Sequence, residues 1–207
     1  MNPLKTIQGT IIAGLVLALI IGWVVGGLQL VELSWFRWIH ILAGITWIGL
    51  LYYFNFVQVP ALAMAAADKG GPGGSGITKY VAPLALLWFR MAAGLTWLTG
   101  ALYLFRRTPG GGDFIGALTL GLLREPHDPY LLVIGIGAWL GTIMLFNVWV
   151  LIWPNQKKVL GIVPAEADAK AKAGRIAGMA SRFNTMSSIP MLYFMVAHYH
   201  GGIVFPS

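Results

Sequence analysis

The chain contains no cysteine among its 207 residues. It therefore forms no disulfide, holds no iron–sulfur cluster through thiolates and carries no covalently attached c-type haem. Any cofactor has to be held by histidine, methionine, carboxylates or packing.

Charged residues are also scarce, at 10% of the chain, whereas soluble domains carry roughly 25%. The mean hydropathy is +0.74, so the sequence indicates that lipid is the solvent. Lysine and arginine number 14 against 7 acidic residues, which gives a net charge of +7. In a membrane protein this excess is explained by the positive-inside rule, and we expect no nucleic-acid partner.

Five apolar stretches are each long enough to cross about 30 Å of hydrocarbon as a helix. They lie at about 9–30, 35–59, 81–105, 129–153 and 186–206. Lipid offers backbone groups no hydrogen-bond partner, which favours helices over an open sheet. We therefore predict an all-α integral membrane protein, one domain over residues 1–207, built as a bundle of five transmembrane helices. The first stretch is too long for a signal-peptide core, so we expect it to be retained.

The basic residues set the predicted orientation. Nine would lie inside if the N-terminus is inside and the C-terminus outside: Lys5, Lys69, Lys79, Lys157, Lys158, Lys170, Lys172, Arg175 and Arg182. Four would lie outside: Arg37, Arg106, Arg107 and Arg124. Six of the inner residues belong to a predicted inner basic loop, 154–185. Its stretch 165–181 favours a helix at the anionic headgroups.

All four histidines fall at the same end of the predicted spans. His40 lies just inside the second span, His127 just before the fourth, and His198 and His200 near the end of the fifth. At 1.5 Å per residue, His40 is roughly 7–8 Å and His198 roughly 12 Å from the outer end of its span. Imidazoles at matched depth indicate a haem or metal site, and we take the deeper His198 as the partner of His40. The alternatives are copper or zinc, or a hydrogen bond to a neighbouring helix.

Two arginines are candidates to contact such a cofactor. Arg37 lies one turn before His40, on the same helix face, where it would pair with a haem propionate or act as an interfacial cation. Arg90 lies about ten residues into the third span, where a charge costs ~2.5–3.5 kcal/mol. No Asp or Glu lies in a predicted span. A bound anion or propionate would therefore be its partner, unless it snorkels to the surface.

Weaker candidates surround these residues. His127 and His200 are alternative ligands, and the run 124–128 around His127 is either a docking or ligand segment or a solvated turn. Trp47 would line a porphyrin or quinone pocket, or simply pack. The sequence around Trp47 also repeats itself, because Phe54-Asn55 recurs as Phe146-Asn147 at the same offset (139 − 47 = 92) that relates Trp47 to Trp139.

Three runs resemble a known family. They are WFRWIHILAGITWIG at 35–49, FNVWVLIWPNQKK at 146–158 and RFNTMSSIPMLYFMVAH at 182–198. They resemble the membrane domain of bacterial cytochrome c-linked urate hydroxylases, the urate oxidase N-terminal membrane domain family, here in a shortened form without the cytochrome c domain. The resemblance implies a redox protein of the bacterial cytoplasmic (inner) membrane that passes electrons toward a c-type cytochrome on the outer face.

These observations lead to two main hypotheses. The first is a membrane-embedded redox subunit that binds haem b near the periplasmic face, with His40 and His198 as iron ligands. It would relay electrons from a donor such as quinol or a small substrate to a periplasmic cytochrome c or partner complex. The second is a non-catalytic accessory subunit of a larger respiratory or photosynthetic complex. A transport role is less favoured, because no intramembrane carboxylate supports an ion path. Whether the chain is itself an oxidoreductase enzyme is left open.

Overall fold

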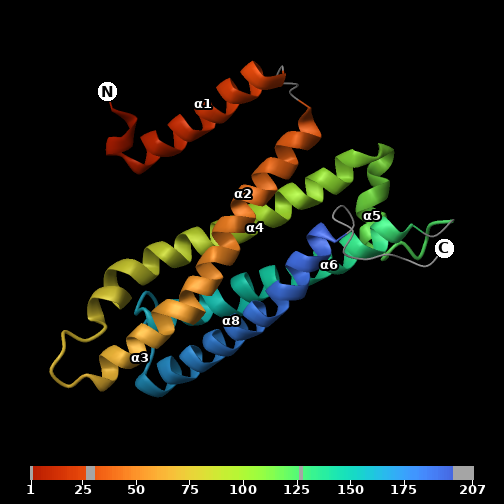
Figure 1. Ribbon diagram of the computed structural model, residues 1–207. Coiled ribbons are helices and arrows are strands. Elements are labelled where there is room, and N and C mark those ends of the chain that lie inside the picture. The colour runs from red at the N-terminus through yellow and green to blue at the C-terminus, as the bar shows by residue number, and fades with distance from the viewer. Residues whose placement is uncertain (1, 27–30, 126–127, 198–207) are drawn as a thin grey trace. The chain divides into compact units, whose positions relative to one another are not determined.

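The computed structural model describes residues 2–26, 31–125 and 128–197, and all regular structure in these ranges is helical (Figure 1). The predicted all-α class is thereby confirmed. The chain divides into two compact units, Met1–Trp35 and Phe36–Ser207.

The first unit contains the helix α1, Ile7–Gly26. A short 3-10 turn, Pro3–Lys5, precedes it, and the side chain of Asn2 caps this turn by accepting a 2.9 Å hydrogen bond from the backbone N–H of Leu4. The 20 residues of α1 extend about 30 Å, the thickness of a hydrocarbon core.

Three long helical segments of the second unit each contain one turn of π-helix. The first runs through α2 (Glu32–Tyr52), a π turn (Tyr53–Gln58) and α3 (Val59–Ala67). The second is a π turn (Ile77–Val81) followed by α4 (Ala82–Arg107). The third is α6 (Pro129–Phe146), a π turn (Asn147–Ile152) and α7 (Trp153–Val159).

A proline follows each π turn by two residues, at Pro60, Pro83 and Pro154. Proline lacks a backbone N–H, and its ring clashes with the carbonyl four residues earlier in a regular α-helix. The wider π turn relieves this clash and lets the helix continue across the membrane. The repeated Phe-Asn pair lies at two of these turns, so the internal repeat is a repeat of this local structure.

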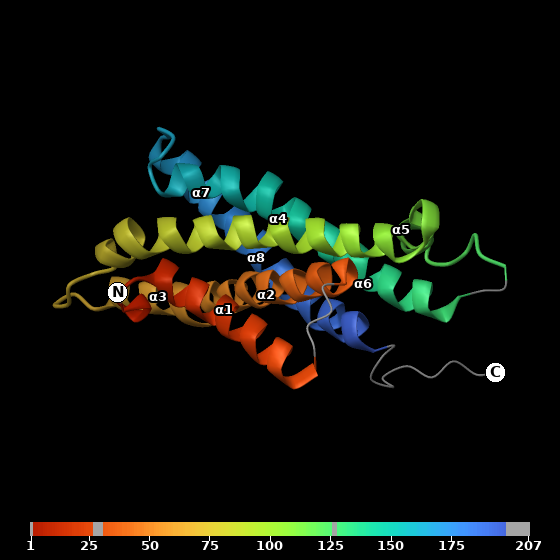
Figure 2. The same cartoon turned by 90° about the horizontal axis from the view of Figure 1, so that it is seen from above.

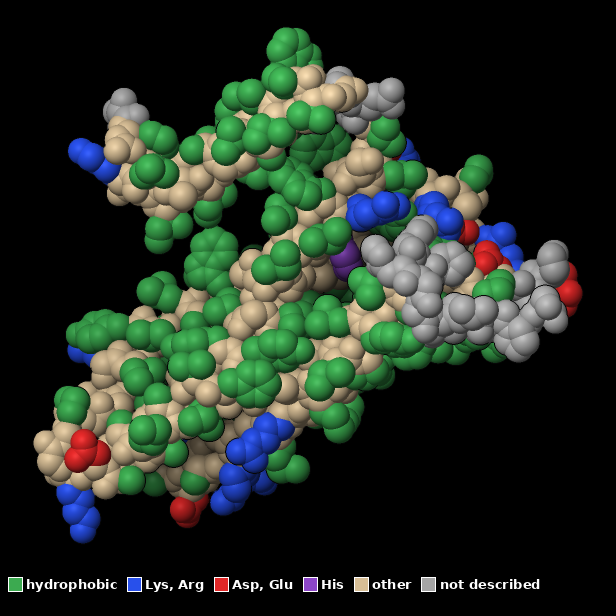
Figure 3. Space-filling model, viewed as in Figure 1, with side chains coloured by type: hydrophobic (Ala, Val, Ile, Leu, Met, Phe, Trp, Pro, Cys, Tyr) green, Lys and Arg blue, Asp and Glu red, His purple; other side chains and the backbone are tan. Residues whose placement is uncertain are grey.

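Within the described residues, four helices are long and apolar enough to cross a membrane: Ile7–Gly26, Glu32–Ala67, Ile77–Arg107 and Pro129–Val159. They match the first four predicted spans. Hydrophobic side chains cover much of the visible face, while lysine and arginine gather toward the helix ends (Figure 3). This is the pattern of a multi-pass membrane protein in contact with lipid.

A single helix runs through the boundary predicted between an inner loop 154–185 and a fifth span at 186, and the position of the membrane there stays a prediction. One uninterrupted helix, α8 (Ala167–Val196), includes both the basic helix former and the first part of that span, with Pro190 in its interior. The alanine-rich, lysine-bearing half favours helix as strongly as the apolar half, so composition changes while the backbone does not. The rest of the predicted span, 198–206, lies outside the described residues.

The core of the second unit lies where α2, α4, α6 and α8 meet. α6 and α8 lie side by side (Figure 1), and α4 runs between the α2–α3 helix and α7 (Figure 2). The large buried side chains come from all of these segments: Trp47, Leu51, Phe54, Leu86, Phe89, Met144, Val148, Ile152 and Met191.

α5 (Gly112–Leu118) packs on α4 and α6 beyond this core. Its buried Asp113 forms an ion pair with Arg107, with 2.7 Å between Oδ2 and Nη1. The other carboxylate oxygen, Oδ1, lies 3.5 Å from Nη2 of Arg124. Asp128 caps α6 by accepting from the N–H of Tyr130 at 2.9 Å. The two described charged ends of the run 124–128, Arg124 and Asp128, thus make local structural contacts.

Candidate functional site

His40 contacts the neighbouring helix through one ring nitrogen. Its Nδ1 lies 2.7 Å from the backbone carbonyl oxygen of Thr96 on α4. A carbonyl only accepts hydrogen bonds, so this contact requires the proton on Nδ1 and leaves a lone pair on Nε2 of the neutral ring. No hydrogen bond of Nε2 is found in the part of the chain that the structure describes.

Gly100 provides the space for the imidazole. A Cβ at this position would lie 2.8 Å from both Cε1 and Nδ1 of His40, well inside van der Waals contact. Gly100 is one helical turn beyond Thr96, so the same face of α4 supplies both the recess and the hydrogen-bond acceptor.

Arg37 faces the same helix one turn earlier. Its Nη2 donates to the hydroxyl of Tyr103, and its Cζ lies 5.0 Å from the centre of the Tyr103 ring. The prediction that Arg37 and His40 share a helix face is therefore confirmed. We call His40, Arg37 and their α4 contacts Thr96, Gly100 and Tyr103 the His40 site.

The structure does not bring Arg90 to this site. The guanidinium carbon of Arg90 lies 3.8 Å from the ring centre of Trp153 on α7, a cation–π contact. Arg90 also precedes Thr96 by six residues on α4, roughly 9 Å along the axis. Trp153 thus offers this cation a partner that the sequence did not indicate, and a role for Arg90 toward a propionate stays a prediction.

Trp47 belongs to the packed core, where 2% of its surface is exposed. Its indole Nε1 is buried without a hydrogen-bond partner in the described structure. Trp47 follows His40 by seven residues, about 10 Å along the helix, so it is a core residue at a different depth.

The remaining predicted ligands, His127, His198 and His200, lie outside the described residues. Across 2–26, 31–125 and 128–197 no group of three or more His, Cys, Asp and Glu side chains could hold a metal ion. A haem needs only one or two axial ligands. His40 fits that need, because metal-bound histidines commonly donate their second ring N–H to a backbone carbonyl, as His40 does to Thr96.

A seam of paired polar side chains along α8 was missed by the sequence analysis. Asn147 donates to Asn184 at 2.8 Å, and Asn184 in turn donates to the carbonyl of Met144 at 2.9 Å. Asn55 donates to Ser181 at 2.8 Å, and the hydroxyls of Tyr52 and Ser188 lie 2.9 Å apart. The signals available in the sequence were Asn55 within the second predicted span and Asn147 within the fourth.

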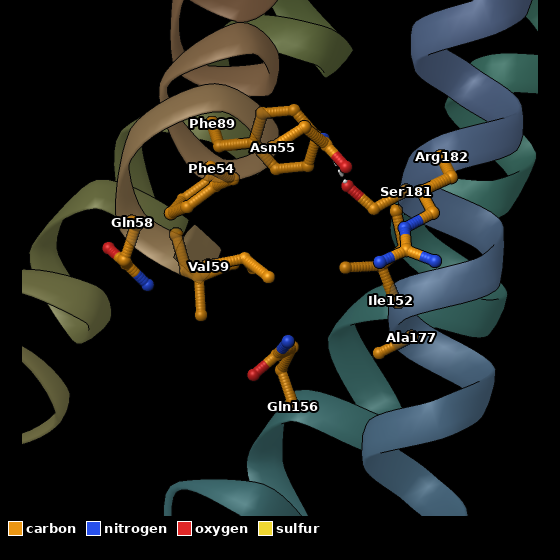
Figure 4. A pocket seen from close by; sticks show the side chains of 12 residues that line it. Phe54, Asn55, Gln58, Val59, Phe89, Ile152, Gln156, Ala177, Ser181 and Arg182 are labelled. Atoms are coloured by element: carbon orange, nitrogen blue, oxygen red, sulfur yellow. Dashed lines mark hydrogen bonds between the residues drawn. The ribbon is translucent and has the colours of Figure 1, made fainter. Parts of the chain in front are cut away.

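A cavity of about 110 Å³ lies below one end of this seam (Figure 4). We call it the Gln58 cavity, because Gln58 is one of the residues that line it. Its polar lining also includes Asn55, Gln156, Ser181 and Arg182. The sequence analysis identified none of these polar residues as a candidate, because each is unremarkable at its own position and gains meaning only from its neighbours in space.

Comparison with known proteins gives one match. Residues 130–206 match the family described as urate oxidase N-terminal. This range contains α7, α8 and all of α6 except its first residue. No curated protein and no solved structure matches the chain.

Proposed function

We propose, from the premise that residues 130–206 belong to the urate oxidase N-terminal family, that this chain is a membrane-embedded redox subunit. It would bind haem b near the periplasmic face and relay electrons to an external c-type cytochrome or a partner complex. The proposal assumes the orientation indicated by the basic residues, with the N-terminus inside.

The observation that carries the proposal is the hydrogen bond from His40 to Thr96. It fixes the tautomer and holds the ring against α4, and it leaves Nε2 as the nitrogen that would bind the iron. Orienting the ring in advance lowers the entropy that ligand binding would cost. His198, at a matching depth in the sequence, is the proposed second ligand.

Arg37 is the proposed partner for a haem propionate. Its bond to Tyr103 holds the guanidinium on the face that His40 uses, and a guanidinium is the side-chain group best suited to pair with a carboxylate. When bound, haem would supply a one-electron carrier. The residues of the chain would orient it, balance its charge and exclude water from the side that faces α4.

The test is a reduced-minus-oxidised visible spectrum of the gently purified protein and of His40→Ala and His198→Ala. We expect a b-type α-band in the wild type and its loss in both variants. His127→Ala and His200→Ala identify the second ligand if His198→Ala retains the band. Absence of the band from a folded wild-type protein supplied with haem would contradict the proposal.

A second candidate is a non-catalytic accessory subunit of a larger membrane complex. The same His40–Thr96 contact supports it, because an interhelical hydrogen bond is also what a purely structural histidine makes in a membrane. In that case His40→Ala would lower stability and leave the spectrum of the complex unchanged. The two candidates therefore differ in the spectrum and not in the stability.

A further inference from the structure

Arg90 is a cation within a candidate membrane span, and its partner is an aromatic ring instead of an acid. Its guanidinium carbon lies 3.8 Å from the ring centre of Trp153, so the group lies over the indole. A guanidinium placed in this way uses its planar face and keeps its N–H groups at the edge. None of them makes a hydrogen bond or ion pair with the residues that the structure describes. These N–H groups are therefore donors for a further ligand.

A second cation lies near the same ring. The Nζ of Lys157, one helical turn after Trp153, is 5.8 Å from its ring centre. Lys157 also has no ion pair in the described part of the chain. Two positive charges close to one ring repel each other unless an anion lies with them. We call Arg90, Trp153 and Lys157 the Trp153 site.

The Trp153 site lies on a line of contacts between α4 and the α6–α7 helix. Trp97 donates to the hydroxyl of Thr142 at 2.9 Å, and a Cβ at Gly94 would lie 3.9 Å from Nε1 of Trp149. The Trp153 site is the next contact along this line. Trp97 and Trp149 are both exposed and apolar, as expected of side chains that face lipid. A ligand at the site therefore has an apolar surface beside it.

The depth of the site is that of a membrane interface. Lys157 lies two residues before the end of the candidate span Pro129–Val159, and Trp153 lies six residues before it, about 9 Å. Tryptophan is enriched at this depth, and the long side chains of lysine and arginine extend toward it. With the N-terminus inside, this end faces the cytoplasm, where basic groups between helices bind anionic headgroups.

We infer that the Trp153 site binds the phosphodiester of an anionic phospholipid of the inner leaflet. The two unesterified oxygens of the phosphodiester would accept hydrogen bonds from Arg90 and Lys157. An acyl chain would lie along the exposed apolar surface at Trp149. The lipid phosphate is thus the anion for Arg90. The inference does not depend on the proposed function, because neither His40 nor Arg37 belongs to the site.

The experiment titrates the detergent-purified full chain with dioleoyl phosphatidylglycerol and counts bound lipids by native mass spectrometry. We expect one saturable lipid. Arg90→Gln and Lys157→Gln are each expected to weaken its binding about tenfold, the effect of losing one hydrogen bond to a charged group. Arg175→Gln on α8 and Lys158→Gln make the same changes of net charge at exposed residues outside the site. These two controls are expected to bind as the wild type does.

Two matched ligands separate the headgroup charge from the acyl chains. Dioleoyl phosphatidylcholine has the same chains and phosphate, but its ammonium cancels the charge, so we expect it to bind at least about tenfold more weakly. Glycerophosphoglycerol is the phosphatidylglycerol headgroup without acyl chains, and at the same concentration it should not displace the lipid. Displacement by this headgroup would identify a site for soluble anions and overturn the lipid assignment.

Three further results would overturn the inference. They are equal affinity for the two lipids, wild-type affinity in Arg90→Gln or Lys157→Gln, and a loss in Lys158→Gln as large as in Lys157→Gln. Lys157 lies in the last turn of its helix, so Lys157→Gln is expected to fold even if Arg90→Gln does not. His40→Ala is expected to keep the lipid affinity, so the lipid site and the haem site are tested separately.

Discussion

The His40 site and the Gln58 cavity both involve the Glu32–Ala67 helix and α4, yet the polar side chains at the two places differ in how far neighbouring helices satisfy their hydrogen bonds. At the His40 site the neighbouring helix satisfies one ring nitrogen, and the other has no hydrogen bond among the described residues. At Gln58, which lines the cavity, the described residues leave a buried side-chain oxygen with no partner. The Asn147–Asn184 pair, fully bonded on the adjoining seam, shows what a purely structural polar contact looks like in the same bundle.

The difference suggests that an incompletely bonded polar group marks a candidate site when it lies beside a recess or cavity, unlike the unpaired indole nitrogen of Trp47 in the packed core. In lipid no water is available to satisfy a polar group, so the bundle has to supply each partner itself. Four substitutions test this view, one on the seam, two at the His40 site and one in the cavity.

The largest effect is expected on the fully bonded seam. Asn184→Ala removes both hydrogen bonds of a side chain with no exposed surface and leaves the Asn147 amide without its partner. We expect a loss of about 2–4 kcal/mol in unfolding free energy, measured by denaturant titration in detergent. Asn155→Ala is the control, because Asn155 donates only to Leu151 of its own helix and should change stability far less. Equal losses of unfolding free energy in Asn184→Ala and Asn155→Ala would mean that the hydrogen bonds between helices in the seam stabilise the protein no more than a bond within one helix.

Gly100→Ala tests the recess at the His40 site. The new Cβ would lie 2.8 Å from the imidazole, so the ring has to leave the Thr96 carbonyl. We expect a loss of about 1–3 kcal/mol in stability and a weakened or shifted haem band. Gly49→Ala is the control, since a Cβ there meets nothing within 4 Å. A normal haem band in Gly100→Ala would show that the ring orientation seen here is not required.

Gln58→Leu should change stability in the opposite direction. It replaces an unpaired buried amide with an apolar group of similar size, so the protein should gain about 1 kcal/mol of unfolding free energy. Thermal unfolding of the variant and the wild type in the same detergent measures this gain. A destabilised Gln58→Leu would indicate that Gln58 is bonded in the protein after all.

The smallest effect is expected for Tyr103→Phe. It removes the acceptor for Arg37, which is exposed, so stability should fall by less than about 1 kcal/mol. The informative measurement is the midpoint potential of the haem, which should shift if Arg37 loses its position beside a propionate. An unchanged potential would leave Arg37 as an interfacial cation.

The sequence predicted those parts of the fold that depend on local composition. Hydropathy located four spans, and helical spacing placed Arg37 and His40 on one face. It did not predict that α8 continues unbroken from its lysine-rich half into apolar sequence, because composition there changes without a helix-ending signal. Pro190 lies inside α8, so this proline does not mark the end of a helix.

The partners of each polar group could not be predicted. Asn184 bonds with Asn147, 37 residues away, and Asn55 with Ser181, 126 residues away, and only the packing of helices decides such pairs. For the same reason, the sequence did not indicate the contact of Arg90 with the Trp153 ring, and its predicted role toward an anion or propionate stays a prediction. The Gln58 cavity is formed by residues of four helical segments and has no signature in any one of them.

The most direct test of the central claim is chemical rescue of His40→Gly. The variant is purified, supplied with haem, and its reduced-minus-oxidised spectrum is recorded with and without added imidazole. If Nε2 of His40 binds the iron, the b-type α-band is absent from the variant and returns as imidazole occupies the vacated space beside Gly100. A band that is present in His40→Gly without imidazole, in a protein that folds normally, would contradict the account.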